Sequence, residues 1–144
     1  MVIWVDADAC PVRAEVEKVA TRRNIRAIMV TNGGIRPSAN PLVQTLYVAQ
    51  GPDEADKLIA DQAQPGDVVV TNDMPLAARA VAAGARVLRT DGSQLSEANV
   101  SEALAMRDLM TDLRAADPFR QGGGKPFSAA DRSRFLDSLE RALR

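Results

Sequence analysis

The sequence contains no histidine and only one cysteine, Cys10. Without histidine, the chain cannot form a Ser-His-Asp triad, a Cys-His pair or an imidazole metal site. A single cysteine provides neither an internal disulfide nor a cysteine-based zinc cluster. Any chemistry must therefore depend on carboxylates, amides, hydroxyls, basic side chains or this one thiol.

Aromatic residues and long apolar segments are also scarce. The 144 residues include one Trp, one Tyr and three Phe, so smaller aliphatic side chains must build most of the core. No apolar segment approaches the roughly 18 residues of a membrane span, and the first residues do not resemble a signal peptide. A formal charge of −1 is unlike that of strongly basic duplex-binding domains. We expect a cytoplasmic protein without a membrane partner.

Short apolar segments alternate with amphipathic segments along the chain. We expect strands over 2–5, 25–31, 45–49, 68–71 and 86–89, and helices that begin at Pro11, Pro52, Pro75, Asn99 and Ser128. This order predicts a three-layer α/β/α fold with a mainly parallel sheet and right-handed crossovers. The glycine-rich segment at about 117–126 is interpreted as a loop within one domain, 1–144, because too few residues follow it for a second. The sequence leaves the oligomeric state open.

Acidic residues follow three of the expected strands. Asp6 and Asp8 follow the first strand, Asp73 follows the fourth and Asp91 follows the fifth. Because the carboxyl ends of parallel strands lie at one edge of a sheet, where ligands bind, we expect these carboxylates to converge. Convergence of like charges would raise their pKa values or require a cation.

Two further acids, Asp53 and Asp56, share one side of the expected second helix. Carboxylate ligands without nitrogen or sulfur favour Mg²⁺ or Mn²⁺ over zinc. One or two such ions can activate a water molecule for hydrolysis of a phosphodiester. Each acid alone also has a structural interpretation as a helix cap or turn residue.

Other candidate residues have competing interpretations. Asp61, Asp67 and Asp108 are interpreted as solvated surface residues. Cys10 precedes an expected helix, where a thiol pKa can be lowered, but we favour a small buried structural residue near the site.

Two glycine-containing segments are candidate anion contacts. The Gly-Gly-Gly-Lys segment at 122–125 lacks P-loop spacing, so we interpret it as a flexible loop that can bring Arg120 or Lys125 to a phosphate. Asn32-Gly33-Gly34 with Arg36 is either an ordinary turn or a second anion contact.

Four sequence segments together resemble the YaiI/YqxD family, a bacterial family without an assigned function. They are Asp-Ala-Asp-Ala-Cys-Pro at 6–11, Asp-Glu-Ala-Asp at 53–56, the segment 66–77 with Thr-Asn-Asp-Met-Pro-Leu-Ala, and Gly-Gly-Gly-Lys-Pro-Phe-Ser before Asp131-Arg132. The similarity covers nearly the whole chain. This family in turn resembles PIN-like nuclease domains at the level of the fold.

The PIN-like resemblance implies roles for particular acids. Asp6 matches the first metal-binding acid, Asp56 or Asp53 the second, Asp73 in Thr-Asn-Asp the third and Asp91 the fourth. It implies Mg²⁺- or Mn²⁺-dependent hydrolysis of phosphodiester bonds, of RNA more often than DNA. The segment from Arg120 to Arg132 and the C-terminal helix are extensions that PIN domains lack.

Three functional hypotheses follow. In a metal-dependent nuclease, Asp6, Asp56 and Asp73 are catalytic, Asp8, Asp53 and Asp91 complete the metal ligands, and single-stranded RNA or another nucleic acid is the expected partner. The candidate phosphate contacts are Asn72, Arg13, Arg120, Lys125 and Arg132.

The alternatives are a haloacid-dehalogenase-like phosphatase, with Asp6 as nucleophile and Asp8 as acid/base, and a non-catalytic metal- or nucleic-acid-binding module. The phosphatase interpretation lacks the usual Thr or Val at position 10 and an evident cap domain.

Overall fold

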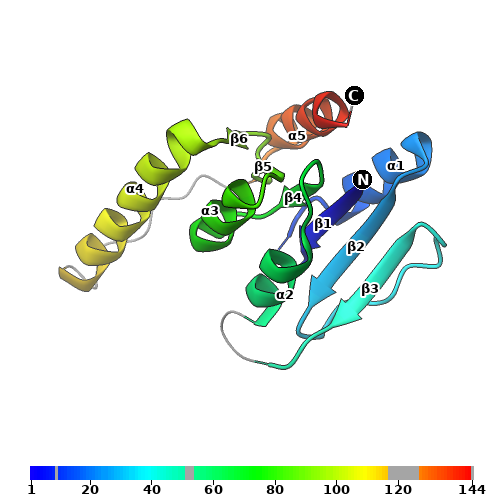
Figure 1. Cartoon of the computed structure of the whole chain (residues 1–144), viewed down its shortest axis with the longest axis horizontal. Helices are drawn as coiled ribbons and strands as arrows, with labels where there is room; N and C mark the ends of the chain where they lie inside the picture. The colour runs from blue at the N-terminus through cyan, green and yellow to red at the C-terminus, as the bar shows by residue number, and fades with distance from the viewer. Residues whose placement is uncertain (9, 51–53, 117–126, 144) are drawn as a thin grey trace.

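A computed structural model describes residues 1–8, 10–50, 54–116 and 127–143 of the chain. Its central sheet has the strand order β3-β2-β1-β4-β5-β6, in which β6 alone is antiparallel to its neighbour. The strands are β1 (Val2–Asp6), β2 (Arg26–Thr31), β3 (Val43–Tyr47), β4 (Val68–Val70), β5 (Arg86–Leu88) and β6 (Gln94–Leu95). The helices are α1 (Arg13–Arg23), α2 (Glu54–Gln62), α3 (Met74–Ala82), α4 (Glu97–Ala116) and α5 (Ala129–Ala142). This confirms the expected α/β architecture (Figure 1).

Two hydrophobic cores lie on opposite faces of the sheet. Because successive side chains of a strand point to opposite faces, Ile3 and Val5 pack against α1 and α5, whereas Trp4 packs against α2 and α3. The central strands β1 and β4 are buried on both faces, as their continuous apolar sequences predict. The helices therefore form one layer on each side of the sheet.

Several helix boundaries are explained by local chemistry. Asn24 ends α1 in the left-handed conformation (φ 56°), as predicted. Ser128 caps α5, and its hydroxyl accepts from the Asp131 amide (3.1 Å) while the Asp131 carboxylate accepts from the Ser128 amide (3.0 Å). These contacts confirm the predicted start of the last helix.

Other boundaries differ from the sequence prediction. α1 begins at Arg13 rather than Pro11, because residues 11 and 12 form a turn. β3 begins and ends two residues earlier than predicted, and the two-residue strand β6 was not predicted. α4 begins at Glu97, and Asn99 does not cap it. Instead, Asn99 lies in the first turn of α4, and its Oδ1 accepts from the amide of Ser96 (2.7 Å), the residue just before the helix.

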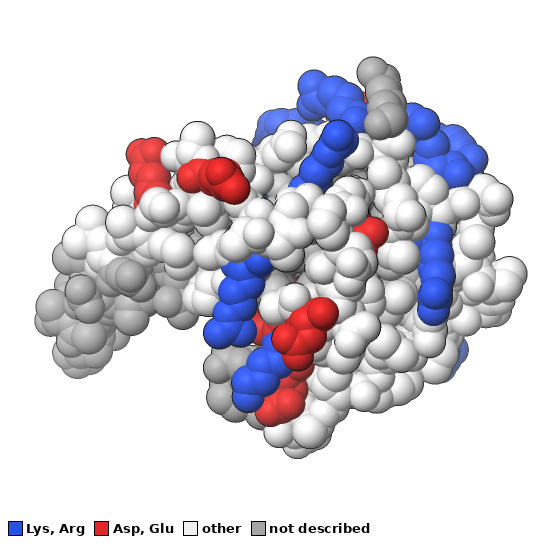
Figure 2. Space-filling view, in the orientation of Figure 1, with Lys and Arg blue, Asp and Glu red and all other residues white. Residues whose placement is uncertain are grey.

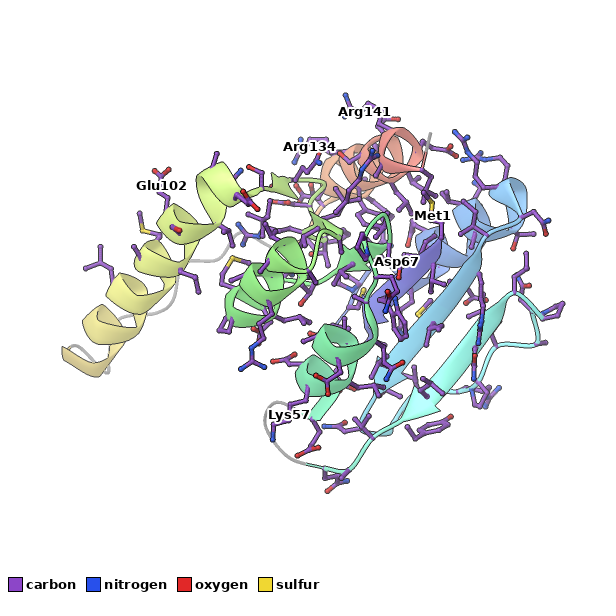
Figure 3. The ribbon with its side chains drawn as sticks, viewed as in Figure 1. Met1, Lys57, Asp67, Glu102, Arg134 and Arg141 are labelled. Carbon is purple, nitrogen blue, oxygen red and sulfur yellow. The ribbon has the colours of Figure 1, made fainter. Side chains whose placement is uncertain are left out.

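Asp67 was predicted to be solvated, and this prediction was wrong. Its side chain is buried (5% exposed) and accepts three hydrogen bonds, from the amides of Val2 (3.0 Å) and Gln64 (2.9 Å) and from the Trp4 indole Nε1 (3.1 Å). Figure 3 shows Asp67 beside Met1, at the edge of the sheet where β1 begins. This carboxylate joins the loop before β4 to the start of β1. Asp61 is exposed, as predicted, and the side chain of Asp108 lies outside the described part.

Charged side chains are unevenly distributed over the surface. Figure 2 shows blue side chains over α1 and α5, near the edge at which β1 begins. Arg22, Arg23 and Arg141 lie there together with Glu140, which forms ion pairs with the first two. No helix in the described segments is long and apolar enough to cross a membrane.

Candidate functional site

The candidate site lies at β1, where the strand order of the parallel sheet reverses. From β1 the chain proceeds to β2 and β3 on one side, whereas β4 lies on the other side of β1 and leads to β5. In open α/β sheets this switch point, outside the carboxyl ends of the strands, is the usual ligand-binding position. Asp6 ends β1 here, and Thr71 and Asp73 follow β4.

Thr71 links the acids of the two neighbouring strands. Its hydroxyl donates to the Asp6 Oδ2 (3.1 Å) and accepts from the Asp73 amide (2.9 Å). Asp73 caps α3, with its Oδ1 accepting from the Leu76 amide (3.0 Å). Within the described part of the chain, the Asp6 Oδ1 and the Asp73 Oδ2 have no hydrogen-bond partner. Each acid thus has one oxygen held by the fold and a second available for a ligand.

Asp8 connects the first strand to the second. Its Oδ1 accepts from the Thr31 hydroxyl (2.6 Å) and its Oδ2 accepts from the Asn32 amide (3.2 Å). Thr31 ends β2 and Thr71 follows β4, so a threonine at the end of each neighbouring strand holds one of the acids at the end of β1. Neither threonine was singled out from the sequence, although each ends an apolar strand segment beside the acids.

The electrostatics show that three of the predicted carboxylates are grouped. Burial raises the pKa of Asp6, and the negative charges of Asp73 and Asp8 raise it further, while the hydrogen bond from Thr71 opposes these effects. A positive charge placed beside Asp6 would remove this unfavourable interaction. The site therefore favours either a proton or a cation.

Asp56 and Asp53 are the two alternatives for the second metal-binding acid that the resemblance implied. Asp56 lies in the first turn of α2, is buried (8% exposed) and interacts with other groups. α2 follows β3, so its first turn lies at the carboxyl edge of the sheet (Figure 1). Asp53 lies outside the described residues.

Asp91 has a structural environment away from these acids. Its Oδ1 accepts from the Ser93 amide (2.9 Å) and hydroxyl (2.5 Å). Burial acts to raise its pKa, but these hydrogen bonds and the nearby Arg89 outweigh burial and lower it. The turn packs on α5, where a Cβ on Gly92 would lie 2.7 Å from the Arg134 backbone. The structure groups Asp91 with Arg89 and Asp131 rather than with Asp6.

The predicted phosphate contacts occupy different places. Arg132 donates to the Pro11 carbonyl (2.9 Å) and to Glu15 (2.8 Å), and so ties α5 to the start of α1. The Asn72 amide side chain bonds the backbone and hydroxyl of Thr90 and joins the ends of β4 and β5. Arg120 and Lys125 lie outside the described residues.

Arg13 and Cys10 lie near the acids that follow β1. Arg13 lines two cavities there, one of which Asp8 also lines. Cys10 is buried, and this burial raises the pKa of its thiol. The protonated thiol agrees with the structural interpretation of this residue.

The described carboxylates provide only part of a binding site for a divalent cation. Among the described residues, no three acidic or cysteine side chains form a complete metal-binding group. Mg²⁺, however, commonly binds one or two carboxylates and completes its shell with waters and substrate phosphates. The free oxygens of Asp6 and Asp73 fit that smaller requirement. A closed cage of protein ligands, in contrast, is not present in this part of the chain.

Comparison with known sequences identifies the family. A profile of the uncharacterized YaiI/YqxD family matches residues 4–144. The chain belongs to this family. It is 64% identical to a UPF0178 protein of Cereibacter sphaeroides over 142 residues, which cover 99% of the chain and 88% of the relative.

Two further relatives extend this result to other bacteria. A UPF0178 protein of Roseobacter denitrificans is 62% identical, with coverage of 99% of the chain and 94% of the relative. A UPF0178 protein of Mesorhizobium japonicum is 50% identical over 99% of the chain and 91% of the relative. These matches confirm the resemblance to the YaiI/YqxD family that the four sequence segments indicated.

Proposed function

We propose that this protein is a Mg²⁺- or Mn²⁺-dependent hydrolase of phosphodiester bonds, with single-stranded RNA as the preferred substrate. The observation that carries the proposal is the Asp6–Thr71–Asp73 arrangement at the switch point of the sheet, in which each acid has one oxygen without a hydrogen-bond partner among the described residues. A PIN-like nuclease would place its first and third metal-binding acids at these two positions.

The chain's own residues would hold the metal and the substrate in defined places. Asp6 and Asp73 are the ligands, and Thr71 fixes the distance between them through its two hydrogen bonds. Asp8 adds negative charge beside Asp6 and keeps the ends of β1 and β2 together. A bound Mg²⁺ or Mn²⁺ supplies charge neutralisation and activation of water at neutral pH, for which this histidine-free chain has no imidazole base.

The contacts of Asp8 weigh against the phosphatase alternative. A general acid must carry a proton and present it to the leaving group. Both oxygens of Asp8 instead accept hydrogen bonds, from the Thr31 hydroxyl and the Asn32 amide, so both are directed at the fold rather than at a leaving group. The geometry therefore favours activation of water over attack by Asp6.

The decisive experiment is cleavage of end-labelled single-stranded RNA and DNA with Mn²⁺ or Mg²⁺. Asp73→Asn removes one charge but keeps a good helix cap, because asparagine caps helices about as well as aspartate. We expect Asp73→Asn and Asp6→Asn to reduce cleavage about 100-fold or more, since each removes a metal ligand. Asp61→Asn is the matched control, because Asp61 is exposed on α2.

Equal cleavage by Asp73→Asn and the wild-type protein would refute the proposal. A phosphate covalently trapped on Asp6 would instead support the phosphatase alternative, because direct attack by water forms no such intermediate. Binding of metal or RNA without any cleavage would support the non-catalytic module.

A further inference from the structure

Two neighbouring cavities lie on the α1 side of the sheet, next to the candidate site. One has a volume of about 400 Å³ and is lined by Asp8 and by the loop that follows β2. The other has a volume of about 380 Å³ and extends along α1 to β3. Their linings share Cys10, Pro11, Arg13 and Ile35. We therefore treat them as an outer and an inner compartment of one groove that begins at the acids.

The inner compartment combines apolar and hydrogen-bonding surfaces. Met29 and Val43 are buried side chains of β2 and β3 that line it, while Thr45, Ser38 and Glu17 provide polar atoms. The Ser38 hydroxyl donates to the Glu17 carboxylate, which fixes these two groups at the wall. Small-molecule sites typically have this combination of apolar walls with a few fixed polar groups, in a volume of about 300–1,000 Å³. A flat heteroaromatic ring with polar edges matches such a compartment.

Two arginines place positive charge in the groove. Arg13 lines both compartments and Arg36 lines the inner one. Neither makes an ion pair or a side-chain hydrogen bond within the described part of the chain. Arg22 and Arg132, on the same face of the sheet, are both paired with glutamates. Guanidinium groups at a cavity that have no partner among the described residues are suited to binding a phosphate, through two parallel hydrogen bonds.

An aromatic side chain lies at the loop that borders this groove. Val43, Thr45 and Tyr47 are alternate residues of β3, so their side chains lie on the same face of the strand. The Tyr47 hydroxyl donates to the carbonyl of Ile35 (3.3 Å), a residue that lines both compartments. Tyr47 is 55% exposed and, unlike the buried Trp4 and Phe135, has a ring available for stacking. Bases of single strands commonly stack on such side chains.

We propose that the groove binds one nucleotide of a single-stranded substrate, with the phosphate at Arg13 and the base in the inner compartment. Arg36 supplies a second positive charge, and Tyr47 supports a neighbouring base. The base must be unpaired to enter, so the groove selects single strands over duplex. Because Asp8 lines the outer compartment, the adjacent phosphodiester is directed towards Asp6 and Asp73. This inference rests on the proposed function and assigns the substrate-binding site to it.

The test is the binding of adenosine 5′-monophosphate, adenosine and inorganic phosphate, measured by calorimetry in EDTA. We expect the nucleotide to bind more tightly than either of its parts, because the groove contacts both base and phosphate. Arg13→Gln should weaken nucleotide binding about tenfold by removing a charged hydrogen-bond donor. Arg79→Gln removes the same charge from an exposed position on α3, across the sheet, and should leave binding unchanged.

A second variant tests the inner compartment without changing charge. Ala14 is exposed on α1 and lines this compartment, so Ala14→Trp should fill it while sparing the core. We expect loss of nucleotide binding with an unchanged far-ultraviolet circular dichroism spectrum and melting temperature. Equal affinities for phosphate and nucleotide, undetectable nucleotide binding, or full binding by both Arg13→Gln and Ala14→Trp would each overturn the inference.

Binding in EDTA separates this inference from the proposed hydrolysis. Asp73→Asn should abolish cleavage and retain nucleotide binding, because the groove lies on the opposite face of the sheet from α3. Nucleotide binding without metal-dependent cleavage would refute the hydrolase and leave the groove assignment supported. Cleavage without nucleotide binding would refute the groove assignment alone.

Discussion

Asp6 lies at the carboxyl end of β1, and Asp67 contacts the amino end of the same strand, so each edge of the sheet has a partly or fully buried aspartate. Asp67 accepts hydrogen bonds from two amides and one indole, which compensate its charge. Among the described residues, Asp6 accepts one hydrogen bond, from Thr71, and its pKa is raised by burial and by two neighbouring acids.

This difference separates a structural carboxylate from one suited to binding. The fold surrounds Asp67 with donors, so a cation there would have to compete with three hydrogen bonds. The fold leaves Asp6 under-compensated and places Asp73 and Asp8 near it. Unfavourable electrostatics of this kind are concentrated at functional sites, because binding a ligand removes them. We therefore expect removal of the Asp67 carboxylate to destabilise the protein, and a cation bound beside Asp6 to stabilise it.

The largest effect on stability is expected at Asp67. Asp67→Ala leaves the buried Trp4 indole and the partly buried Val2 amide without their acceptor. Buried donors without partners cost about 1–3 kcal/mol each, so we expect a loss of about 3 kcal/mol or more in the free energy of unfolding. Urea denaturation monitored by Trp4 fluorescence measures it. Asp61→Ala is the exposed control, and an equally small loss in both variants would contradict the structural role of Asp67.

The second-largest effect on stability is expected from a divalent cation, which should bind at the carboxyl edge of the sheet and not at the amino edge. Relative to EDTA, Mg²⁺ or Mn²⁺ at about 100 times its dissociation constant should stabilise the wild-type protein by about 2.7 kcal/mol, because the folded state alone presents the paired acids. Asp73→Asn should lose most of this increase, whereas Asp61→Asn should retain it. Thermal denaturation at several cation concentrations provides the measurement. The same increase in Asp73→Asn and the wild-type protein would place the cation elsewhere.

Local sequence signals predicted the carboxyl edge better than the amino edge. Asp6 and Asp73 follow continuous apolar strands, and parallel strands bring such positions together regardless of loop details. Asp67 was interpreted as a solvated surface residue, because two of its three donors belong to a strand more than 60 residues earlier. One signal was available: a buried tryptophan needs an acceptor for its indole N–H.

Contacts between residues far apart in the sequence also explain where the other predicted site residues lie. Asp91 follows a strand, as the pattern requires, but β5 is two strands away from β1 and its turn packs on α5. Sequence position cannot show such a distance across the sheet. Arg132 was a candidate phosphate contact, because its partners, Pro11 and Glu15, are more than 110 residues away in the sequence and could not be foreseen. The groove beside α1 was not predicted for a similar reason, since its walls come from α1 and the turn before it, from β2, from the loop after β2 and from β3.

The smallest effect is the pH dependence of stability that Asp6 contributes in EDTA. The pKa of Asp6 in the folded protein is raised above the ordinary value of 3.8. Between pH 3.8 and this raised pKa, Asp6 therefore keeps its proton in the folded state but has lost it in the unfolded state. The contribution of Asp6 to stability is therefore present below about pH 3.8 and is lost as pH rises through the raised pKa. Asp6→Asn removes this dependence and keeps an oxygen that can accept from Thr71. The variant should thus gain stability relative to the wild-type protein between pH 3 and pH 7, which urea denaturation across this range measures. A difference that stays constant with pH, or that falls towards neutrality, would mean that Asp6 is as well compensated as Asp67 and that the edges do not differ in this respect.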